Sequence, residues 1–234
     1  MDQIVDFVNQ GGNLLWLQDP GDLQNLEALA ERLQLTFIKG VLVDNNPSLR
    51  ETLRIQHPAV IPIISYGQHK ITEEMRYNTL FPIANALEFK KDSPWTTTPL
   101  LITLPESWIE TAGFTLDVKF EENKCDIAGP HTPGLALERT LENKKSQRLV
   151  VIGDSDFLAN TYIGAGANLM LGLNIINWLN TDDSLIAINP KSAPDLSLKL
   201  DDNEIAIIGL GFLVFLPLSL IGTGIFIWQR RRKR

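Results

Sequence analysis

The stretch that decides the fold is residues 148–156, which read RLVVIGDSD. The branched apolar residues at its start are typical of a buried strand, and the Gly-Asp-Ser-Asp that follows is typical of a turn. A second segment, NLLWL at 13–17, likewise ends in a polar turn, QDPGD at 18–22. Both segments predict buried strands that end in acidic turns.

Helical spacing is found next to these strands. Leu23, Leu26, Ala30 and Leu33 recur at helical intervals with Asp22 as the expected N-cap, and residues 168–179 place Leu169, Leu173, Ile176 and Leu179 on one face. An amphipathic helix is expected to end at Gly11-Gly12. Further strands are expected at 36–43, 59–64, 99–103 and 134–141, the last paired with 148–152 through the polar residues 142–147. This alternation predicts an α/β fold with a largely parallel sheet flanked by helices.

Residues 205–228 (IAIIGLGFLVFLPLSLIGTGIFIW) form 24 uncharged residues near the C-terminus. A helix of that length spans roughly 36 Å, enough for a hydrocarbon core of about 30 Å. A buried core helix is the alternative, but few soluble helices are apolar on every face. We therefore expect an α/β domain over 1–188, a connector over 189–204, a transmembrane helix over 205–228 and a basic tail over 229–234.

The charge distribution predicts the orientation of that helix. The last five residues are all Lys or Arg, and the rest of the chain has 28 acidic against 16 basic residues. The positive-inside rule places the tail in the cytoplasm and the domain outside the cytoplasmic membrane. Because residues 1–30 show no signal-peptide pattern, the chain is expected to be the C-terminal portion of a longer or split protein. If the chain is complete, a tail anchor with a cytoplasmic domain is the competing topology.

Three residues of the apolar segment could dock it to a membrane partner. Pro217 lies within the span, and Ser219 and Thr223 form a small-xxx-small pair. Proline frees a helix carbonyl and small residues allow close helix packing, although Gly and Pro are also common in membrane helices generally.

Composition and motifs exclude several functions. The acidic domain lacks the clustered Lys and Arg that nucleic-acid binding needs. No G-x-x-x-x-G-K-[ST] loop is present, so the chain is not its own P-loop ATPase, and Gly164-Ala165-Gly166 is only half of a dinucleotide fingerprint. The single Cys125 lies among acidic residues that disfavour a thiolate. The three histidines lack metal-ligand spacing and are expected to be solvated loop residues, so no metal or cofactor is predicted.

The two acidic turns are the candidate site. Ligands bind at the carboxyl ends of strands in open α/β sheets, where both turns could meet. The candidate ligand- or partner-binding residues are Asp19, Asp154, Ser155, Asp156 and Asn160. Turns are also rich in Asp for local reasons, so simple turn and cap hydrogen bonds remain the alternative. A serine hydrolase using Ser155 is a further alternative, with the catalytic constellation in an unusual chain order.

An ordered set of segments resembles a known family. The matching residues are 7–15 (FVNQGGNLL), Asp19-Pro20, 99–103 (PLLIT) with Ser107-Trp108, 148–160, Asn168, Asn174, 177–179 and 185–188. In this order they resemble the auxiliary, substrate-binding-like component of an uncharacterised ABC transport system related to bacterial gliding motility.

The resemblance implies a glutamine-amidotransferase-like fold without catalytic residues, held by membrane helices. It also implies an ABC permease and a separate P-loop ATPase as partners, and a further polypeptide that supplies the family's N-terminal region. The expected function is a non-enzymatic, membrane-anchored accessory subunit whose external domain binds a substrate or partner. A purely structural scaffold is the remaining alternative.

Overall fold

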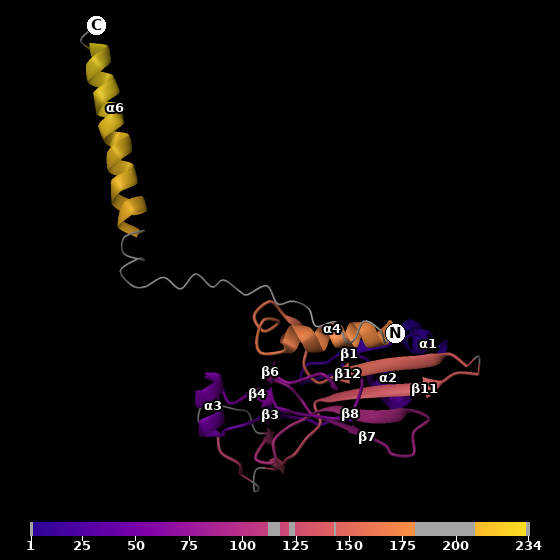
Figure 1. Ribbon diagram of the computed structural model, residues 1–234. Helices are drawn as coiled ribbons and strands as arrows, with labels where there is room; N and C mark the ends of the chain where they lie inside the picture. The colour runs from indigo at the N-terminus through magenta and orange to yellow at the C-terminus, as the bar shows by residue number, and fades with distance from the viewer. Residues whose placement is uncertain (1, 112–117, 122–124, 143, 181–208, 233–234) are drawn as a thin grey trace. The chain divides into compact units, whose positions relative to one another are not determined.

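A computed structural model describes residues 2–111, 118–121, 125–142, 144–180 and 209–232 (Figure 1). The chain forms two compact units, residues 1–190 and residues 191–234. The described part of the first unit is a mixed α/β domain, and the described part of the second is a single apolar helical segment.

A five-stranded mixed sheet forms the centre of the first unit. Its strands, in spatial order, are β1 (Leu14–Leu17), β12 (Ser146–Ile152), β11 (Gly134–Thr140), β8 (Thr96–Ile102) and β5 (Ser65–Tyr66). β1 runs parallel to β12, whereas the other three neighbouring pairs are antiparallel. The predicted pairing of 134–141 with 148–152 is confirmed.

The prediction of a largely parallel sheet is wrong. It rested on strands that are apolar throughout, which is typical of strands covered on both faces. Here β12 is covered on both faces, although its partner β11 joins it through a hairpin and therefore runs antiparallel. Burial on two faces gives the same sequence pattern whichever direction the neighbouring strand runs.

Three smaller sheets complete the domain. They are β10 (Ile127–Ala128), β9 (Trp108–Glu110) and β3 (Val41–Val43); β2 (Leu35–Phe37) with β7 (Leu87–Phe89); and β4 (Val60–Ile63) with β6 (Thr79–Pro82). The predicted strands at 59–64 and 99–103 are confirmed as β4 and part of β8. The single strand expected over 36–43 is wrong, because the chain turns at Gly40, whose φ of +122° favours glycine, and β2 and β3 join different sheets.

Four helices are described in the domain: α1 (Asp2–Asn9), α2 (Glu27–Leu33), α3 (Pro47–Leu53) and α4 (Asn168–Leu179). As predicted, α1 ends just before Gly11, which has a φ of +94°. α2 begins later than expected, with Leu26 rather than Asp22 as its N-cap. Gln24 and Asn25 have positive φ values, so a right-handed helix cannot run through them.

The bounds of α4 are confirmed, but its predicted face is wrong. The residues packed on the sheet include Leu171, Ile175 and Trp178, whereas Leu169 and Ile176 are 43% and 46% exposed. Both faces of α4 are rich in apolar residues, so helical spacing alone could not tell the buried face from the exposed one.

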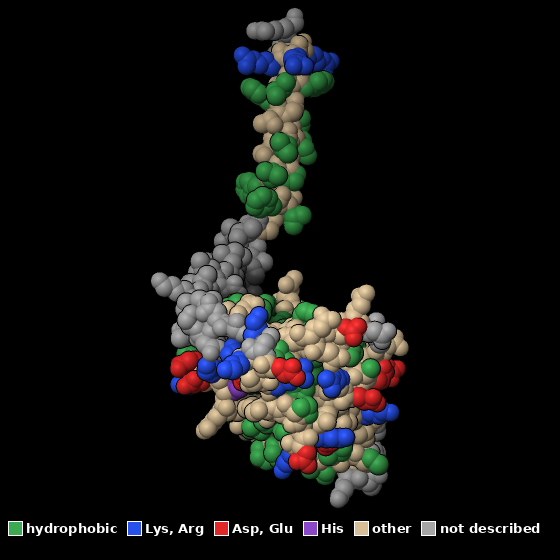
Figure 2. All heavy atoms as spheres, turned by 90° about the vertical axis from the view of Figure 1, so that its right-hand side faces the viewer, with side chains coloured by type: hydrophobic (Ala, Val, Ile, Leu, Met, Phe, Trp, Pro, Cys, Tyr) green, Lys and Arg blue, Asp and Glu red, His purple; other side chains and the backbone are tan. Residues whose placement is uncertain are grey.

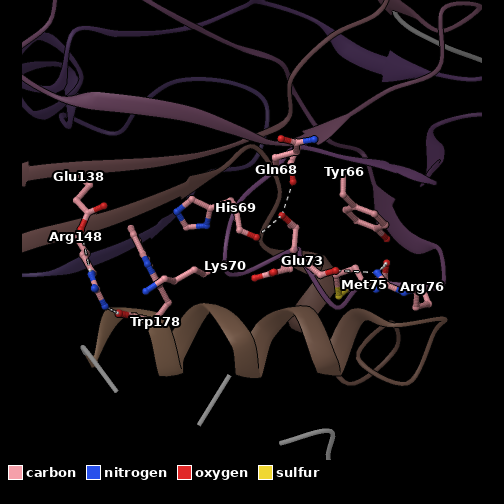
Figure 3. A pocket seen from close by; sticks show the side chains of 12 residues that line it. Tyr66, Gln68, His69, Lys70, Glu73, Met75, Arg76, Glu138, Arg148 and Trp178 are labelled. Atoms are coloured by element: carbon pink, nitrogen blue, oxygen red, sulfur yellow. Dashed lines mark hydrogen bonds and ion pairs between the residues drawn. The ribbon is translucent and has the colours of Figure 1, made fainter. Parts of the chain in front are cut away.

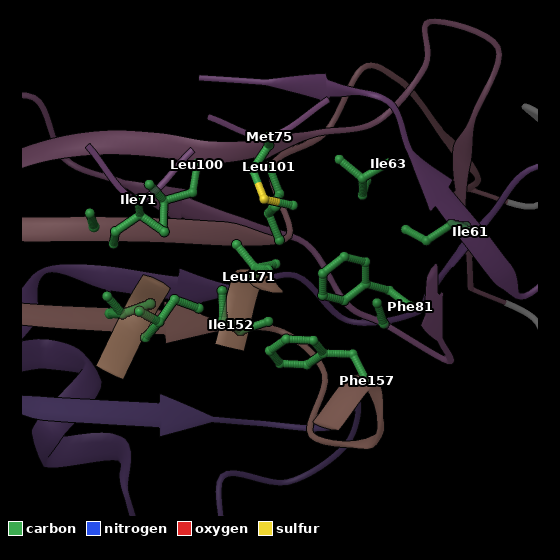
Figure 4. Close-up of a cluster of buried hydrophobic side chains, with 14 of the residues drawn as sticks. Ile61, Ile63, Ile71, Met75, Phe81, Leu100, Leu101, Ile152, Phe157 and Leu171 are labelled. Carbon is green, nitrogen blue, oxygen red and sulfur yellow. The ribbon is translucent and has the colours of Figure 1, made fainter. Parts of the chain in front are cut away.

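Two apolar cores lie on opposite faces of the central sheet. On one face, Val150 and Ile152 of β12 pack with Leu171 and Ile175 of α4, in the cluster drawn in Figure 4. On the other face, neighbouring residues of β12 pack with α1 and α2. The domain therefore has α4 on one face of the sheet and α1 and α2 on the other, and Figure 1 shows α4 running beside β1.

The described part of the second unit is a turn of π-helix, η3 (Gly211–Phe215), followed by α6 (Leu216–Arg232). Residues 212–232 are long and apolar enough to cross a membrane, and none of that stretch is buried. Figure 2 shows apolar side chains along this helix and a belt of basic side chains at its C-terminal end. The segment at 205–208 of the predicted span lies outside the described residues.

Candidate functional site

The parallel pairing of β1 with β12 brings the two acidic turns to one edge of the sheet. Leu17 lies opposite Ile152, so both strands end at the same level, and the Gln18 amide donates to the Ile152 carbonyl at 2.9 Å. Because parallel strands share a carboxyl-terminal edge, residues 136 positions apart become neighbours.

Asp19 fastens the two turns together. Its Oδ1 accepts the backbone N–H of Ser155 at 2.7 Å, and its Oδ2 accepts the Ser155 hydroxyl at 2.8 Å. Asp19 is exposed and Ser155 is half-buried. Both oxygens of the Asp19 carboxylate are therefore engaged in holding the turn that follows β12.

Asp154 is fully buried beside this clamp. Its Oδ1 accepts the Asp156 amide at 2.7 Å, while its Oδ2 has no hydrogen-bond partner within the described ranges. Burial raises the pKa of Asp154 to about 8; the Asp156 amide opposes this rise, and the Asp19 and Asp156 carboxylates add to it. Asp154 therefore retains its proton near neutral pH.

A close backbone contact supports the same turn. The Asn85 amide donates to the Gly153 carbonyl at 2.7 Å. A Cβ added to Gly153 would lie 2.3 Å from the Asn85 backbone oxygen, so only glycine fits there. The side-chain Oδ1 of Asn85 is buried and, within the described part of the chain, unpartnered.

Of the two remaining predicted site residues, Asp156 contacts this cluster through its amide, which donates to Asp154 Oδ1. Asp156 begins the short 3-10 helix η2 (Asp156–Leu158) and is exposed, as is Asn160. The structure thus bonds Asp19 to Ser155 and Asp154 to the Asp156 amide, and no hydrogen bond among the described residues ties Asn160 to either pair. Over the described residues, no group of three or more His, Cys, Asp or Glu could hold a metal ion.

The geometry around Ser155 does not assemble a hydrolase. Its hydroxyl donates to a carboxylate instead of to a histidine. Each histidine ring is engaged elsewhere: His57 Nδ1 accepts the Ala59 amide, His69 Nδ1 accepts the Ile71 amide, and His131 Nε2 lies 2.9 Å from the Ile127 carbonyl oxygen. A Ser–His pair of the kind that activates a serine nucleophile is not formed at Ser155 in the part of the chain described.

Sequence reasoning missed a pocket of the domain that the structure shows. It has a volume of about 830 Å³ and lies between residues 66–76, the far ends of β11 and β12, and the end of α4 (Figure 3). Its wall is polar and carries both signs of charge, with basic side chains from Lys70, Arg76 and Arg148 and carboxylates from Glu73 and Glu138. No motif spacing links these residues, which lie up to 78 positions apart.

Arg148 and Trp178 form the rigid side of this pocket. Arg148 Nη1 donates to the Trp178 carbonyl at 2.8 Å and its guanidinium lies 5.1 Å from the Trp178 ring centroid. The His69 ring meets the same indole edge-on at 4.8 Å. His69 does lie in a loop and is half-buried, but its contact with Trp178 was not predicted, because an aromatic contact across 109 positions leaves no local signal.

The residues predicted to dock the membrane segment are satisfied within their own helix. The hydroxyls of Ser219 and Thr223 donate to the carbonyls of Leu216 and Leu220 at 2.8 and 2.9 Å. Pro217 is the second residue of α6, directly after the π-helical turn, so the backbone irregularity expected at this proline lies ahead of it.

Comparisons with known proteins show a family and a fold. The model of a family described as "ABC-type uncharacterized transport system", an auxiliary-component family, matches residues 1–186. No curated protein matches the chain. The solved structure of the mmIFT52 N-terminal domain is similar with a TM-score of 0.54 and 15% identity, over 76% of this chain and 69% of that chain. At that identity the likeness concerns the fold alone, and the amidotransferase-like fold stays a prediction.

Proposed function

The chain belongs to this family of ABC-type transport-system auxiliary components, and from that premise we propose that it is a non-enzymatic, membrane-anchored accessory subunit. In this proposal the α/β domain lies outside the cytoplasmic membrane and binds a substrate or a partner protein. The observation that carries the proposal is the joint presence of the family's domain and an exposed apolar helix with basic residues in its last turn.

The charges support the proposed orientation. Arg230, Arg231 and Arg232 follow the apolar stretch directly, and Arg232 lies 5.3 Å from the Trp228 ring centroid. Tryptophan favours the membrane–water interface, and clustered Arg residues favour the cytoplasmic side. The C-terminus would then be cytoplasmic and the helix would cross the membrane once.

The proposed partners are an ABC permease and a separate P-loop ATPase, in a system of the kind related to gliding motility. Transport energy must come from another chain, because no phosphate-binding P-loop occurs in this sequence. Pro217, Ser219 and Thr223 are the proposed contacts with the permease in the membrane, where small residues let helices approach closely.

Two kinds of binding surface support the proposed role of the domain. The interlocked turns of Asp19, Asp154 and Ser155 give a rigid polar edge, and the pocket beside Arg148 offers space for a small polar ligand. The alternative of a purely structural scaffold is distinguished by thermal unfolding. A small ligand that enters the pocket should raise the melting temperature of the full chain, whereas a scaffold should show no such rise.

Isolation of the full chain in mild detergent tests the proposal. A permease and a nucleotide-binding subunit encoded with this chain should be recovered with it in repeated preparations. Repeated recovery of the chain without either subunit would contradict the proposal. A control chain that ends at residue 204 keeps the domain and lacks the apolar helix, so a partner bound only through the membrane should be lost from it.

A further inference from the structure

β1 is the outer strand of the central sheet, and its far edge is open. It pairs only with β12 within the described part of the chain. The amide of Gln18 donates toward β12, and backbone groups alternate sides along a strand. The N–H and C=O groups of Leu15 and Leu17 therefore point away from the sheet, where no described residue gives them a hydrogen-bond partner.

Edge strands are normally protected, and of the usual devices the described part of the chain gives β1 only its short length of four residues. Natural proteins guard edge strands with lysine, proline, bulges or a covering segment. β1 reads LLWL and α4, which packs against it, reads NLMLGLNIINWL, so the two elements contain no charged residue at all. At the chain's 21% charged residues, the same length would carry about three charges.

The exposed apolar residues of α4 lie on the flank nearest β1. The side chain of Asn174 donates to the Ile71 carbonyl at 2.9 Å. The flank of α4 that carries Asn174 therefore faces the loop between β5 and β6, next to the opposite edge of the sheet. Leu169, Leu173 and Ile176 lie on the opposite flank by helical geometry, and two of them are more than 40% exposed. The residues of β1 and of this stripe carry no charge.

The chemistry of the occupant follows from the layers around the edge. Leu15 and Leu17 pack on the α4 side, whereas Leu14 and Trp16 pack on the α1 and α2 side. A strand added beyond β1 would extend a sheet whose last strand has apolar neighbours on both faces, and strands buried on both faces are apolar at every position. Its own backbone would satisfy the groups of Leu15 and Leu17.

We propose that the open edge of β1 receives an extended, continuously apolar segment of four or five residues from another subunit of the transport system, as a sixth strand beneath Leu169 and Ile176. This proposal rests on the proposed function, because the partner is a subunit of that system. The edge supplies the hydrogen bonds, and the stripe on α4 supplies the apolar cover.

A charge placed on the stripe tests the proposal in the full chain. Ile176→Lys puts an ammonium where the added strand would pack, and Ile127→Lys makes the same change on β10 at a site of similar exposure, 43% against 46%. We expect Ile176→Lys to lower the amount of partner recovered in mild detergent by at least about tenfold and Ile127→Lys to leave it unchanged. Leu17→Pro, which removes one outward N–H at an edge position, should act like Ile176→Lys.

Hydrogen exchange identifies what covers the edge. The amides of Leu15 and Leu17 should exchange at least about tenfold more slowly in the isolated complex than in the isolated full chain. Cross-linking at position 176 should join the chain to an apolar segment of the transporter subunit.

Three results overturn the proposal: equal recovery of partner with Ile176→Lys and wild type, protection of these amides already in the monomeric chain, or protection that rises with the concentration of this chain alone. The last two assign the edge to this chain itself or to a second copy. Failure of the wild-type chain to bring down any permease or ATPase contradicts the proposed function instead.

Discussion

Asp154 and Ser155 are adjacent in the chain but lie in opposite environments. The carboxyl of Asp154 is fully buried with one oxygen unpartnered in the described part of the chain, whereas Ser155 is half-buried and held by an exposed carboxylate. A buried acid whose pKa lies near 8 is neutral under most conditions.

The buried carboxyl of Asp154 predicts a stability that falls as pH rises. Its folded-state pKa of about 8 exceeds the ordinary 3.8, so between these values the folded protein holds a proton that the unfolded chain has released. The free energy of unfolding then decreases with rising pH across this window, by at most about 1.4 kcal/mol per pH unit from this group. Asp154→Asn keeps an acceptor for the Asp156 amide and should flatten this slope.

Thermal and urea unfolding of both chains between pH 4 and pH 9 measures this difference. The variant should gain stability relative to wild type as pH rises and should be the more stable chain at pH 8. Parallel pH profiles for the two proteins would show that Asp154 is ionised in the folded state.

Ser155→Ala distinguishes a structural serine from a nucleophile. The variant loses the 2.8 Å bond to Asp19, which should lower the free energy of unfolding by about 1 kcal/mol. A fluorophosphonate probe should label neither the wild type nor the variant, because no histidine of the described residues bonds the hydroxyl, which donates to the Asp19 carboxylate. Labelling of the wild type that disappears in the variant would restore the hydrolase alternative.

The meeting of the two turns could be predicted from single residues, but the pocket could not. Strands ending at Leu17 and Ile152 carried their own turn signals, so one assumption about parallel pairing placed Asp19 beside Ser155. The rings of His69 and Trp178 are in contact although the two residues lie far apart in the sequence, and no sequence pattern around either residue predicts this contact. Long-range contacts of this kind depend on the complete packing and leave no periodic signal.

At the scale of elements, existence was easier to predict than direction or face. The bounds of α4 and the β11–β12 hairpin followed from spacing and from a polar connection. The sheet's direction did not, because burial on both faces makes parallel and antiparallel strands look alike. Which flank of α4 is exposed also depends on where the sheet ends. The strand order that sets this end is known only from the folded domain.

Asn168 links three elements, and its removal should loosen all of them. Its Oδ1 accepts the Leu80 amide of β6 at 2.9 Å, and its Nδ2 donates to the carbonyls of Leu80, Phe157 and Tyr162. Asn168→Ala leaves these buried groups unpaired and should lower the free energy of unfolding by about 3 kcal/mol. Urea unfolding measures this free energy. The control Asn160→Ala, at an exposed site, should lower the free energy of unfolding by less than about 0.5 kcal/mol. Equal effects of the two changes would contradict this role.

For the whole molecule, the single cysteine reports the proposed orientation. Cys125 is exposed, and it is the only thiol of the chain. In spheroplasts, a maleimide that cannot cross membranes should label Cys125 without permeabilisation, because the domain faces outward in our proposal. A Cys125→Ser, Lys233→Cys chain should label only after detergent is added.

The opposite labelling pattern would place the domain in the cytoplasm, as expected for a tail anchor. Replacing Arg230, Arg231 and Arg232 together by Glu should weaken the preference of wild type for one orientation, because these residues supply the positive-inside signal. Labelling of Cys125 in the two chains compares the orientations directly. Unchanged labelling in the Glu chain would show that the basic cluster does not set the topology.

α6 remains helical through Arg232, and this continuity gives the basic residues a particular arrangement. Successive residues of a helix differ by about 100° in direction, so Arg230, Arg231 and Arg232 point to different sides of the axis within about 3 Å of its length. In a bilayer, such a collar meets lipid phosphates at every azimuth. These arginines would fix the depth of the helix in the bilayer but not its rotation about its own axis. The side of the helix that faces the transporter would then be set by contacts with a neighbouring protein.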